Sequence, residues 1–249
     1  MTDTVFYRTI WRWHFYAGLF VIPFVLILSL SGAFYLFKPQ VDRWEERAFK
    51  GFPVAGAVSP DRQTDAALAA FPGAKLHSYR LPQIAGDAAL IHLALPGGPN
   101  GTGAMRDVFV SPQGKVLGSL DPQTRLIALD RKLHGQLLLG RHGSWLVELA
   151  ASWAIVMLLT GLYMWWPDGR GLAGVVWPRL GSGKRLFWRD LHAVTGFWVS
   201  GLALVLLLSG LPWASVWGSA FTAVRTEMGW IKRAPASTIR GKAAAGDQH

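Results

Sequence analysis

Three apolar stretches dominate the sequence, and each is long enough to cross a bilayer. Trp13–Phe37 contains no charged residue, Gly143–Pro167 contains one, and the third stretch, which begins at Leu191, stays uncharged for longer still. A transmembrane helix needs about 20 mostly apolar residues, and a helix satisfies its own backbone hydrogen bonds inside lipid. Pro212 favours a break in the third stretch, so its spanning part is 191–213. We therefore predict a mainly α membrane protein with three transmembrane helices.

The first and third stretches share a repeated pattern. Each has a histidine near its start, a glycine four residues later and a Ser-Gly pair further on: His14, Gly18 and Ser31-Gly32 in the first, His192, Gly196 and Ser209-Gly210 in the third. Residues four apart share a helix face. Two imidazoles at one depth, each beside a bare glycine, would suit a haem iron in a six-coordinate electron-transfer site. The alternative is that both histidines face lipid headgroups and the glycines only let helices pack closely.

The absence of cysteine and the nearby arginines restrict the cofactor further. Without cysteine the chain cannot form disulfides, thiolate-bound iron–sulfur clusters or covalent c-type haem. Arginine binds carboxylates in a bidentate manner, so arginines close to the two histidines suit haem propionates. No glycine-rich dinucleotide fingerprint occurs, so electrons would come from an outside donor. We expect haem b, with iron ligands and further contacts from these residues: His14, His192, Gly18, Gly196, Arg12 and Arg189.

The net charge of +10 reflects membrane orientation rather than nucleic-acid binding. The basic residues form no single stripe, and most of them lie beside apolar stretches. Arg8 and Arg12 precede the first stretch, and the short loop 168–190 between the second and third is strongly basic. Positively charged flanks face the cytoplasm, which places the N-terminus there and the segment 38–141 outside. The basic C-terminal tail opposes this orientation weakly.

A small polar domain lies between the first and second stretches. Ser59-Pro60 has the residues of a helix start and predicts a helix over Asp61–Phe71. Three or four short strands follow, about Lys75–Leu81, Ala88–Leu95, Arg106–Val110 and Lys115–Ser119. Ser111–Gly114 is typical of a turn between the last two strands, which favours one helix packed on a small antiparallel sheet. We expect a returning helix from about Pro122 and a disordered tail after Ala234.

The predicted organisation therefore has six parts. They are the N-terminus with the first transmembrane helix, the α+β domain with its connector, the second transmembrane helix with its extension, a basic loop, the third transmembrane helix, and an interfacial segment with the tail. The corresponding residues are 1–38, 39–132, 133–167, 168–190, 191–213 and 214–249.

Several short motifs follow one another in a set order along residues 8–230. They are Arg12-Trp13-His14, Ser31-Gly32, Leu133-His134-Gly135, Leu139-Gly140-Arg141-His142-Gly143, Thr160-Gly161-Leu162-Tyr163-Met164-Trp165-Trp166-Pro167, Asp190-Leu191-His192 and Ser209-Gly210-Leu211-Pro212-Trp213. In these motifs the chain resembles the PepSY-associated transmembrane proteins, a bacterial inner-membrane family linked to iron uptake. The strand–turn–strand Val108–Leu117 resembles the family's periplasmic PepSY module. The resemblance implies a multi-pass inner-membrane protein with a periplasmic PepSY-like domain inserted between its first and second transmembrane helices.

The resemblance also implies an activity. Some members of the family are di-haem reductases that pass electrons to ferric siderophores outside the inner membrane. A ferric-chelate reductase, or its electron-transfer subunit, would carry one or two haems b and take electrons from a cytoplasmic-side flavoprotein or quinol. His134 and His142 match positions that serve a second, outer haem in the family. Those members continue with further spans, so here a second copy of the chain or a missing C-terminal half would complete that site.

Two other interpretations stay open at this stage. The PepSY-like domain could bind a peptide or an envelope protein, with the three helices acting only as a non-enzymatic anchor in membrane lipid. Glu148, an acid within the second stretch, could hydrogen-bond a histidine ring nitrogen and orient it, or it could simply lie near the membrane interface. The sequence assigns no catalytic residue and no specific substrate.

Overall fold

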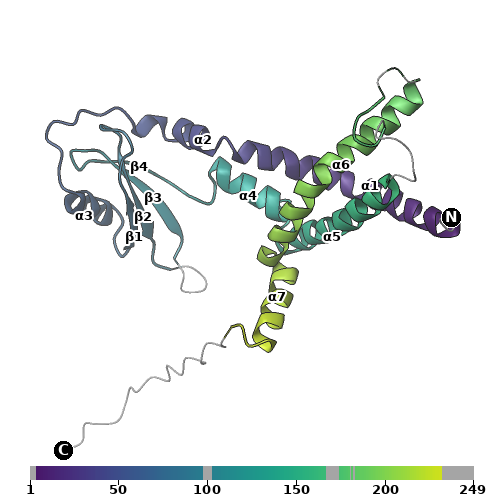
Figure 1. Cartoon of the computed structure of the whole chain (residues 1–249). Helices are drawn as coiled ribbons and strands as arrows, with labels where there is room; N and C mark the ends of the chain where they lie inside the picture. Colours follow the sequence, from purple (N-terminus) through teal and green to yellow (C-terminus); the bar gives the residue numbers. More distant parts are fainter. Residues whose placement is uncertain (1–3, 98–102, 167–173, 180, 182, 232–249) are drawn as a thin grey trace, which may run out of the picture. The chain divides into compact units, whose positions relative to one another are not determined.

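Three long helices and one small sheet make up the chain. The computed structural model describes residues 4–97, 103–166, 174–179, 181 and 183–231, so the predicted disorder after Ala234 lies outside the described residues. Within that part, three helical segments are long and apolar enough to cross a membrane: Thr4–Tyr35, Gly140–Trp165 and Lys184–Trp213. These helices and the antiparallel sheet between the first and second of them confirm the predicted fold class (Figure 1). The chain divides into two compact units, 22–147 and the combination of 1–21 with 148–249.

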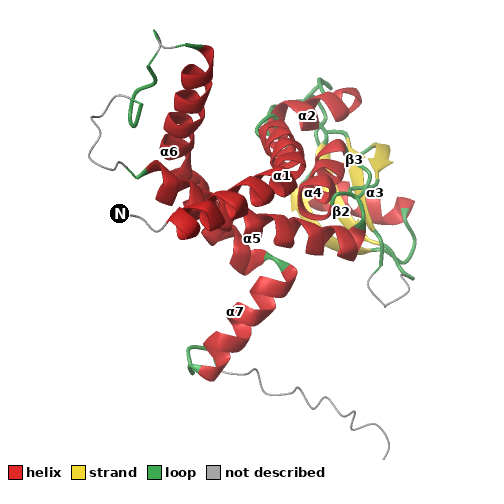
Figure 2. Cartoon of the chain, turned by 90° about the vertical axis from the view of Figure 1, so that its right-hand side faces the viewer, coloured by secondary structure: helices red, strands yellow, loops and turns green. Residues whose placement is uncertain are grey.

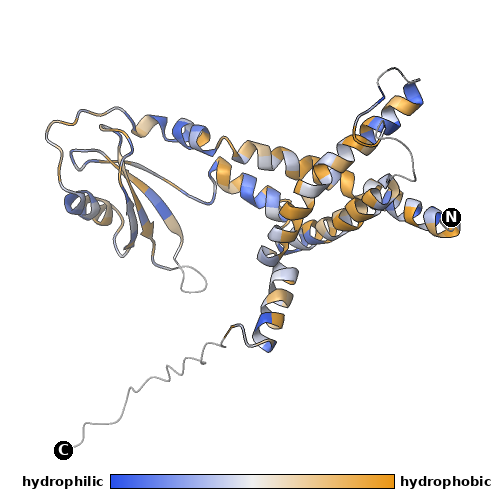
Figure 3. Ribbon diagram, in the orientation of Figure 1, coloured by the Kyte–Doolittle hydropathy of each residue, from blue (hydrophilic) through white to orange (hydrophobic). Residues whose placement is uncertain are grey.

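The spanning helices are α1 Thr4–Tyr35, α5 Gly140–Trp165 and α6 Lys184–Gly210. Apolar residues run along most of the length of these helices, whereas the sheet contains both apolar and polar residues (Figure 3). Helix α1 continues through Pro23, as membrane helices do where neighbours satisfy the freed carbonyl. The predicted break at Pro212 is confirmed, because α6 ends at Gly210. A short 3-10 turn and a further helix follow: η2 Leu211–Trp213 and α7 Ser215–Glu227.

The sheet is an antiparallel meander in the order β1-β2-β3-β4. Figure 2 shows its strands in yellow. Its strands lie within a residue of the predicted ones: β1 Lys75–Arg80, β2 Ala89–Ala94, β3 Met105–Val110 and β4 Val116–Leu120. The turn predicted at Ser111–Gly114 is confirmed, because the Gly114 amide donates to the Ser111 carbonyl at 2.9 Å. Gly114 has a φ of 82°, a conformation that glycine adopts without steric cost.

The two faces of the sheet have different neighbours, since successive side chains of a strand point to opposite sides. One face packs under α3 Pro60–Ala70, with a core of Ala67, Ile91, Leu93, Val108 and Val110. Helix α3 begins as predicted, because the Ser59 side chain accepts a hydrogen bond from the Arg62 amide. On the other face, Phe109 stacks on Phe49 with ring centroids 4.0 Å apart.

A buried arginine joins this second face to two short helices, α2 Lys38–Glu45 and α4 Leu126–Gln136. The side chain of Arg125 is 11% exposed and contacts four carboxylates: Glu46 at 2.9 Å, Glu45 at 3.1 Å, Asp42 at 3.2 Å and Asp107 at 3.5 Å. The other oxygen of Glu45 accepts from the first amide of α4 at 2.9 Å, where the helix dipole favours a negative charge. This cluster therefore holds α2, β3 and α4 together.

The return to the membrane differs from the sequence prediction. The helix expected from about Pro122 begins only at Leu126, because the Asp121 side chain accepts from the Gln123 amide at 2.8 Å and closes a turn first. Helix α4 then ends in a reversal in which two leucines adopt left-handed conformations, φ 49° and 59°. A Cβ at Gly143 would lie 1.7 Å from the Gln136 carbonyl oxygen, so this reversal requires glycine there.

Candidate functional site

His14 of α1 and His192 of α6, which are distant in the sequence, lie next to each other. Their ring centroids are 6.2 Å apart and their planes are inclined at 72°. Two imidazoles that bind one metal ion from opposite sides, with metal–nitrogen bonds of about 2 Å, have centroids roughly 6 Å apart. The structure thus brings the predicted pair together at a separation that suits a shared metal, while iron ligation itself stays a prediction.

Helix α5 holds the His14 ring by hydrogen bonds. Its Nδ1 atom lies 2.9 Å from the main-chain oxygen of Met157 and 3.3 Å from the hydroxyl of Thr160. A carbonyl oxygen can only accept, so Nδ1 carries the proton and Nε2 keeps a free lone pair. The Thr160 hydroxyl donates its own proton to the Val156 carbonyl at 2.7 Å, which leaves its lone pairs facing Nδ1. Histidines that bind metals are usually oriented in this way by a partner on the other ring nitrogen.

The same ring lies against Gly161 of α5. A Cβ at position 161 would come within 2.9 Å of His14 Cε1, closer than atoms of this kind approach. We call Thr160 and Gly161 the His14 seat, because they place a hydroxyl beside the ring nitrogen and a bare Cα beside the ring. The sequence pattern had paired His14 with Gly18, where a Cβ would make an ordinary contact of 3.8 Å with the Met157 sulfur. Gly161 belongs to one of the sequence motifs, but spacing within α1 says nothing about which residue of the neighbouring helix His14 contacts.

His192 is held less firmly. Its side chain is exposed, and within the described residues its ring contacts His14 but has no hydrogen bond. Gly196, one helical turn further on, has no atom within 4 Å of the position that a Cβ would occupy. The face of α6 that the sequence predicted to be bare is therefore open beside His192.

A cavity of about 950 Å³ lies beside the two histidines, between α1, α5 and α6. This volume is within the range of about 300–1,000 Å³ that is typical of cofactor pockets. Gly161 and Gly196 line it together with aromatic residues such as Trp11 and Trp165. Trp165 stacks on Phe197 with ring centroids 4.0 Å apart, which gives the cavity a flat apolar wall.

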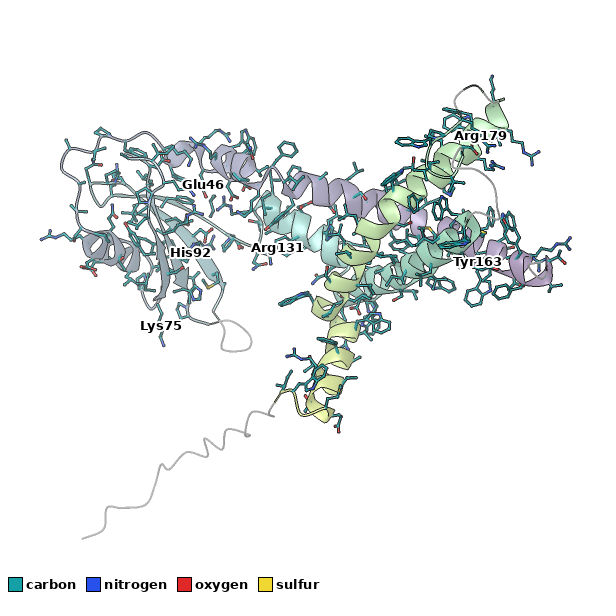
Figure 4. The ribbon with its side chains drawn as sticks, in the orientation of Figure 1. Glu46, Lys75, His92, Arg131, Tyr163 and Arg179 are labelled. Carbon is teal, nitrogen blue, oxygen red and sulfur yellow. The ribbon has the colours of Figure 1, made fainter. Side chains whose placement is uncertain are left out.

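One side of this cavity is basic. Arg8, Arg179 and Arg189 line it, so predicted Arg189 lies there, whereas Arg12 does not belong to the described lining. Figure 4 labels Arg179 near one end of α6. Asp190, which is fully buried, accepts two hydrogen bonds from the guanidinium of Arg179 at 2.7 and 3.0 Å and two from that of Arg189 at 2.8 and 3.2 Å. These hydrogen bonds raise the pKa of Arg179 above its ordinary value. This side of the cavity therefore has three guanidiniums and one carboxylate, and its net positive charge suits an anionic ligand.

His134 and His142 lie in the other unit and are not paired with each other. The Nδ1 atom of His134 is 2.8 Å from the Ser31 hydroxyl, and its Cε1 would lie 3.6 Å from a Cβ at Gly32. His142 is exposed, and its ring lies edge-on to Trp145 with centroids 5.5 Å apart. Among the described residues no histidine ring contacts His134, so their role at a second haem stays a prediction.

Glu148 of α5 anchors a helix. Its carboxylate is buried and accepts hydrogen bonds from three amides at the start of α7: Ser215 at 2.7 Å, Val216 at 2.9 Å and Trp217 at 3.2 Å. The indole of Trp217 also donates to the Ser152 hydroxyl at 3.0 Å. A helix N-terminus carries partial positive charge and favours an anion. The sequence suggests either a histidine partner or a place near the membrane interface for this acid, and the structure shows that its carboxylate binds the amides at the start of α7.

Comparison with known proteins identifies one family. No curated protein matches the chain. The family described as "PepSY-associated TM region" matches residues 11–249, which includes every histidine discussed above. Since this match covers nearly the whole sequence, the chain belongs to the PepSY-associated TM region family.

Proposed function

We propose that this chain is a haem-b-binding electron-transfer protein of the bacterial inner membrane that supports the reduction of ferric iron or ferric siderophores outside that membrane. The observation that carries the proposal is the approach of His14 and His192 to a ring separation of 6.2 Å at the edge of a large cavity. Family membership gives the membrane context, and the resemblance to iron-uptake reductases gives the direction of electron flow.

The donor set favours haem over a free metal ion. Within the described residues, no cluster of three or more histidines and carboxylates could hold a metal by itself. A metal between two imidazoles would therefore take its other ligands from water or from a cofactor, and in an apolar cavity a porphyrin, which supplies four nitrogens in one plane, fits better than several waters. The open position beside Gly196 leaves room for such a flat ring.

The chain's own residues have distinct tasks in this proposal. His14 offers the Nε2 lone pair, because its Nδ1 proton is held by the Met157 carbonyl. Trp165 and Phe197 supply an apolar wall that keeps water from the site. The guanidinium of Arg8, which has no ion pair with a described residue, suits a propionate carboxylate. Bis-histidine haem b supplies a one-electron couple without an open position for oxygen.

Electrons would enter at the basic end of the helices, which the positive-inside rule assigns to the cytoplasm. The donor is a flavoprotein or a quinol, since the sequence contains no dinucleotide fingerprint. One electron converts a chelated ferric ion to the ferrous ion, which oxygen-rich chelators hold less firmly. The PepSY-like sheet would then meet the ferric chelate on the outer side.

The absorption spectrum of the detergent-purified protein tests this proposal directly. After expression with ample haem, we expect a Soret band and the bands of low-spin haem b. The variants His14→Ala and His192→Ala should each lose the low-spin spectrum. His77→Ala is the matched control, because His77 is an exposed histidine on β1. A colourless wild-type protein would contradict the proposal and favour the alternative in which the helices only anchor a peptide- or protein-binding domain.

A further inference from the structure

The two histidines of the pair are held very differently. We propose that Thr160 and Gly161 position His14 as the fixed ligand of an unequal pair, in which His192 is the ligand that can be exchanged. This inference rests on the proposed haem function for its chemistry. The seat itself is a property of the protein without cofactor, so it can be tested separately.

Both sides of the His14 ring are determined by α5. The Met157 carbonyl at 2.9 Å and the Thr160 hydroxyl at 3.3 Å fix the edge that carries Nδ1. Gly161 fixes how close the ring approaches the helix, since a single added carbon would lie 2.9 Å from Cε1. A rotation of the ring would break the hydrogen bonds, and a shift toward α5 is blocked by the backbone. The orientation of His14 is therefore set before any cofactor binds.

The same combination occurs a second time, in the other unit of the chain. Ser31 and Gly32 receive His134, with the hydroxyl 2.8 Å from Nδ1 and the bare glycine next to Cε1. A hydroxyl residue followed directly by glycine thus seats a histidine from another helix in both cases. This recurrence supports the view that Thr160 and Gly161 are positioning residues rather than an incidental contact.

His192 has no comparable seat. Its ring is exposed, it has no hydrogen bond within the described residues, and Gly196 leaves open space one turn away. An imidazole without a partner on its second nitrogen is free to rotate about its side-chain bonds. A small external base such as imidazole should replace it more easily than it replaces His14.

Chemical modification of the cofactor-free protein tests the seat. Diethyl pyrocarbonate acylates accessible imidazole nitrogens, and mass spectrometry quantifies each histidine. The seat occupies Nδ1 of His14 and leaves Nε2 open, so we expect acylation of both ring nitrogens to be several-fold faster at His192 than at His14. Gly161→Ala and Thr160→Val should raise the doubly acylated fraction of His14, whereas Thr160→Ser should leave it low. Gly201→Ala is the matched control for the glycine variant, because Gly201 has no atom near its Cβ position.

Haem binding tests the consequence for the ligands. Loss of an orienting partner of a metal-binding histidine typically costs about 10–100-fold in affinity. Thr160→Val removes the more distant of the two partners of Nδ1 and keeps the Met157 carbonyl, so we expect about 10-fold, with a shift of the low-spin electron paramagnetic resonance signal. Thr160→Ser, which keeps the hydroxyl, should restore both. Added imidazole should restore a low-spin spectrum to His192→Ala but not to His14→Ala.

The outcomes separate this inference from the proposed function. If His14 is doubly acylated as fast as His192, or if Gly161→Ala and Thr160→Val behave like Gly201→Ala, the seat is refuted even in a protein that binds haem. Equal rescue of both histidine variants by imidazole would refute the inequality of the pair. A protected His14 in a protein that never binds haem would leave the seat intact but refute both the proposed function and the ligand role.

Discussion

Replacing Glu148 by glutamine should release α7 from α5. The Glu148 carboxylate accepts from three backbone amides and is 6% exposed, so its hydrogen bonds are charge-assisted and poorly screened. Hydrogen bonds to charged groups contribute about 1.5–3 kcal/mol and neutral ones about 0.5–1.5 kcal/mol. An amide that keeps an acceptor loses about 1 kcal/mol, and an amide that faces the NH2 group of glutamine, which cannot accept, loses more, so the total is at least about 3 kcal/mol. Since 1.4 kcal/mol corresponds to a factor of ten in an equilibrium constant, the ratio of docked to undocked α7 should fall at least about 100-fold.

The absence of cysteine makes this prediction easy to measure. A single Ser219→Cys substitution places a spin label on α7, and its mobility in detergent or in lipid nanodiscs reports whether the helix is docked. Glu148→Gln should raise the mobility strongly. Glu227→Gln makes the same chemical change at an exposed site near the end of α7 and should leave the label unchanged. Equal mobility in the two variants would show that the carboxylate does not hold α7.

Five further substitutions, two of them controls, test the packing of unit 22–147, each by thermal unfolding or folded yield in detergent. Arg125→Met leaves four carboxylates around an apolar side chain and should destabilise the unit by about 3–5 kcal/mol. Arg80→Met removes a half-exposed pair with Glu46 and should cost at most about 1 kcal/mol. Gly143→Ala should reduce the folded fraction, since its Cβ would collide with the Gln136 carbonyl, whereas Gly135→Ala should not. Ser59→Ala should cost about 1 kcal/mol through loss of the α3 cap.

Features that depend on neighbours in sequence were predictable. The strands were placed within a residue because β-branched and aromatic residues between turn signals reflect a local preference. The start of α3 followed from Ser59 and Pro60, whose roles depend only on the next few residues. The start of α4 was predicted too early, because the Asp121 side chain accepts a hydrogen bond from the Gln123 amide and forms a turn in place of the first helical residues. This turn also depends on neighbours in sequence, but its sequence pattern is less regular than that of a helix start.

Features that depend on a second helix could not be read from one helix alone. The repeat correctly suggested that His14 and His192 would approach each other, since both begin a span at the same depth. It also suggested that the bare surface beside His14 would be Gly18, because the two share a face of α1. In the structure that shared face packs on α5, where Met157 both binds the His14 ring through its carbonyl and places its sulfur near Gly18.

The surface that sets the position of His14 therefore belongs to α5, and its essential glycine is Gly161. A helical repeat specifies which residues share a face, but the partner of that face follows from how helices pack, which sequence spacing does not contain. The same reasoning explains Glu148, whose partners are amides far along the chain that reach it only after α6 has turned at Pro212. The residues that position a side chain or a helix in such a bundle thus lie on the helix that it packs against, and in this chain α5 provides them for both His14 and α7.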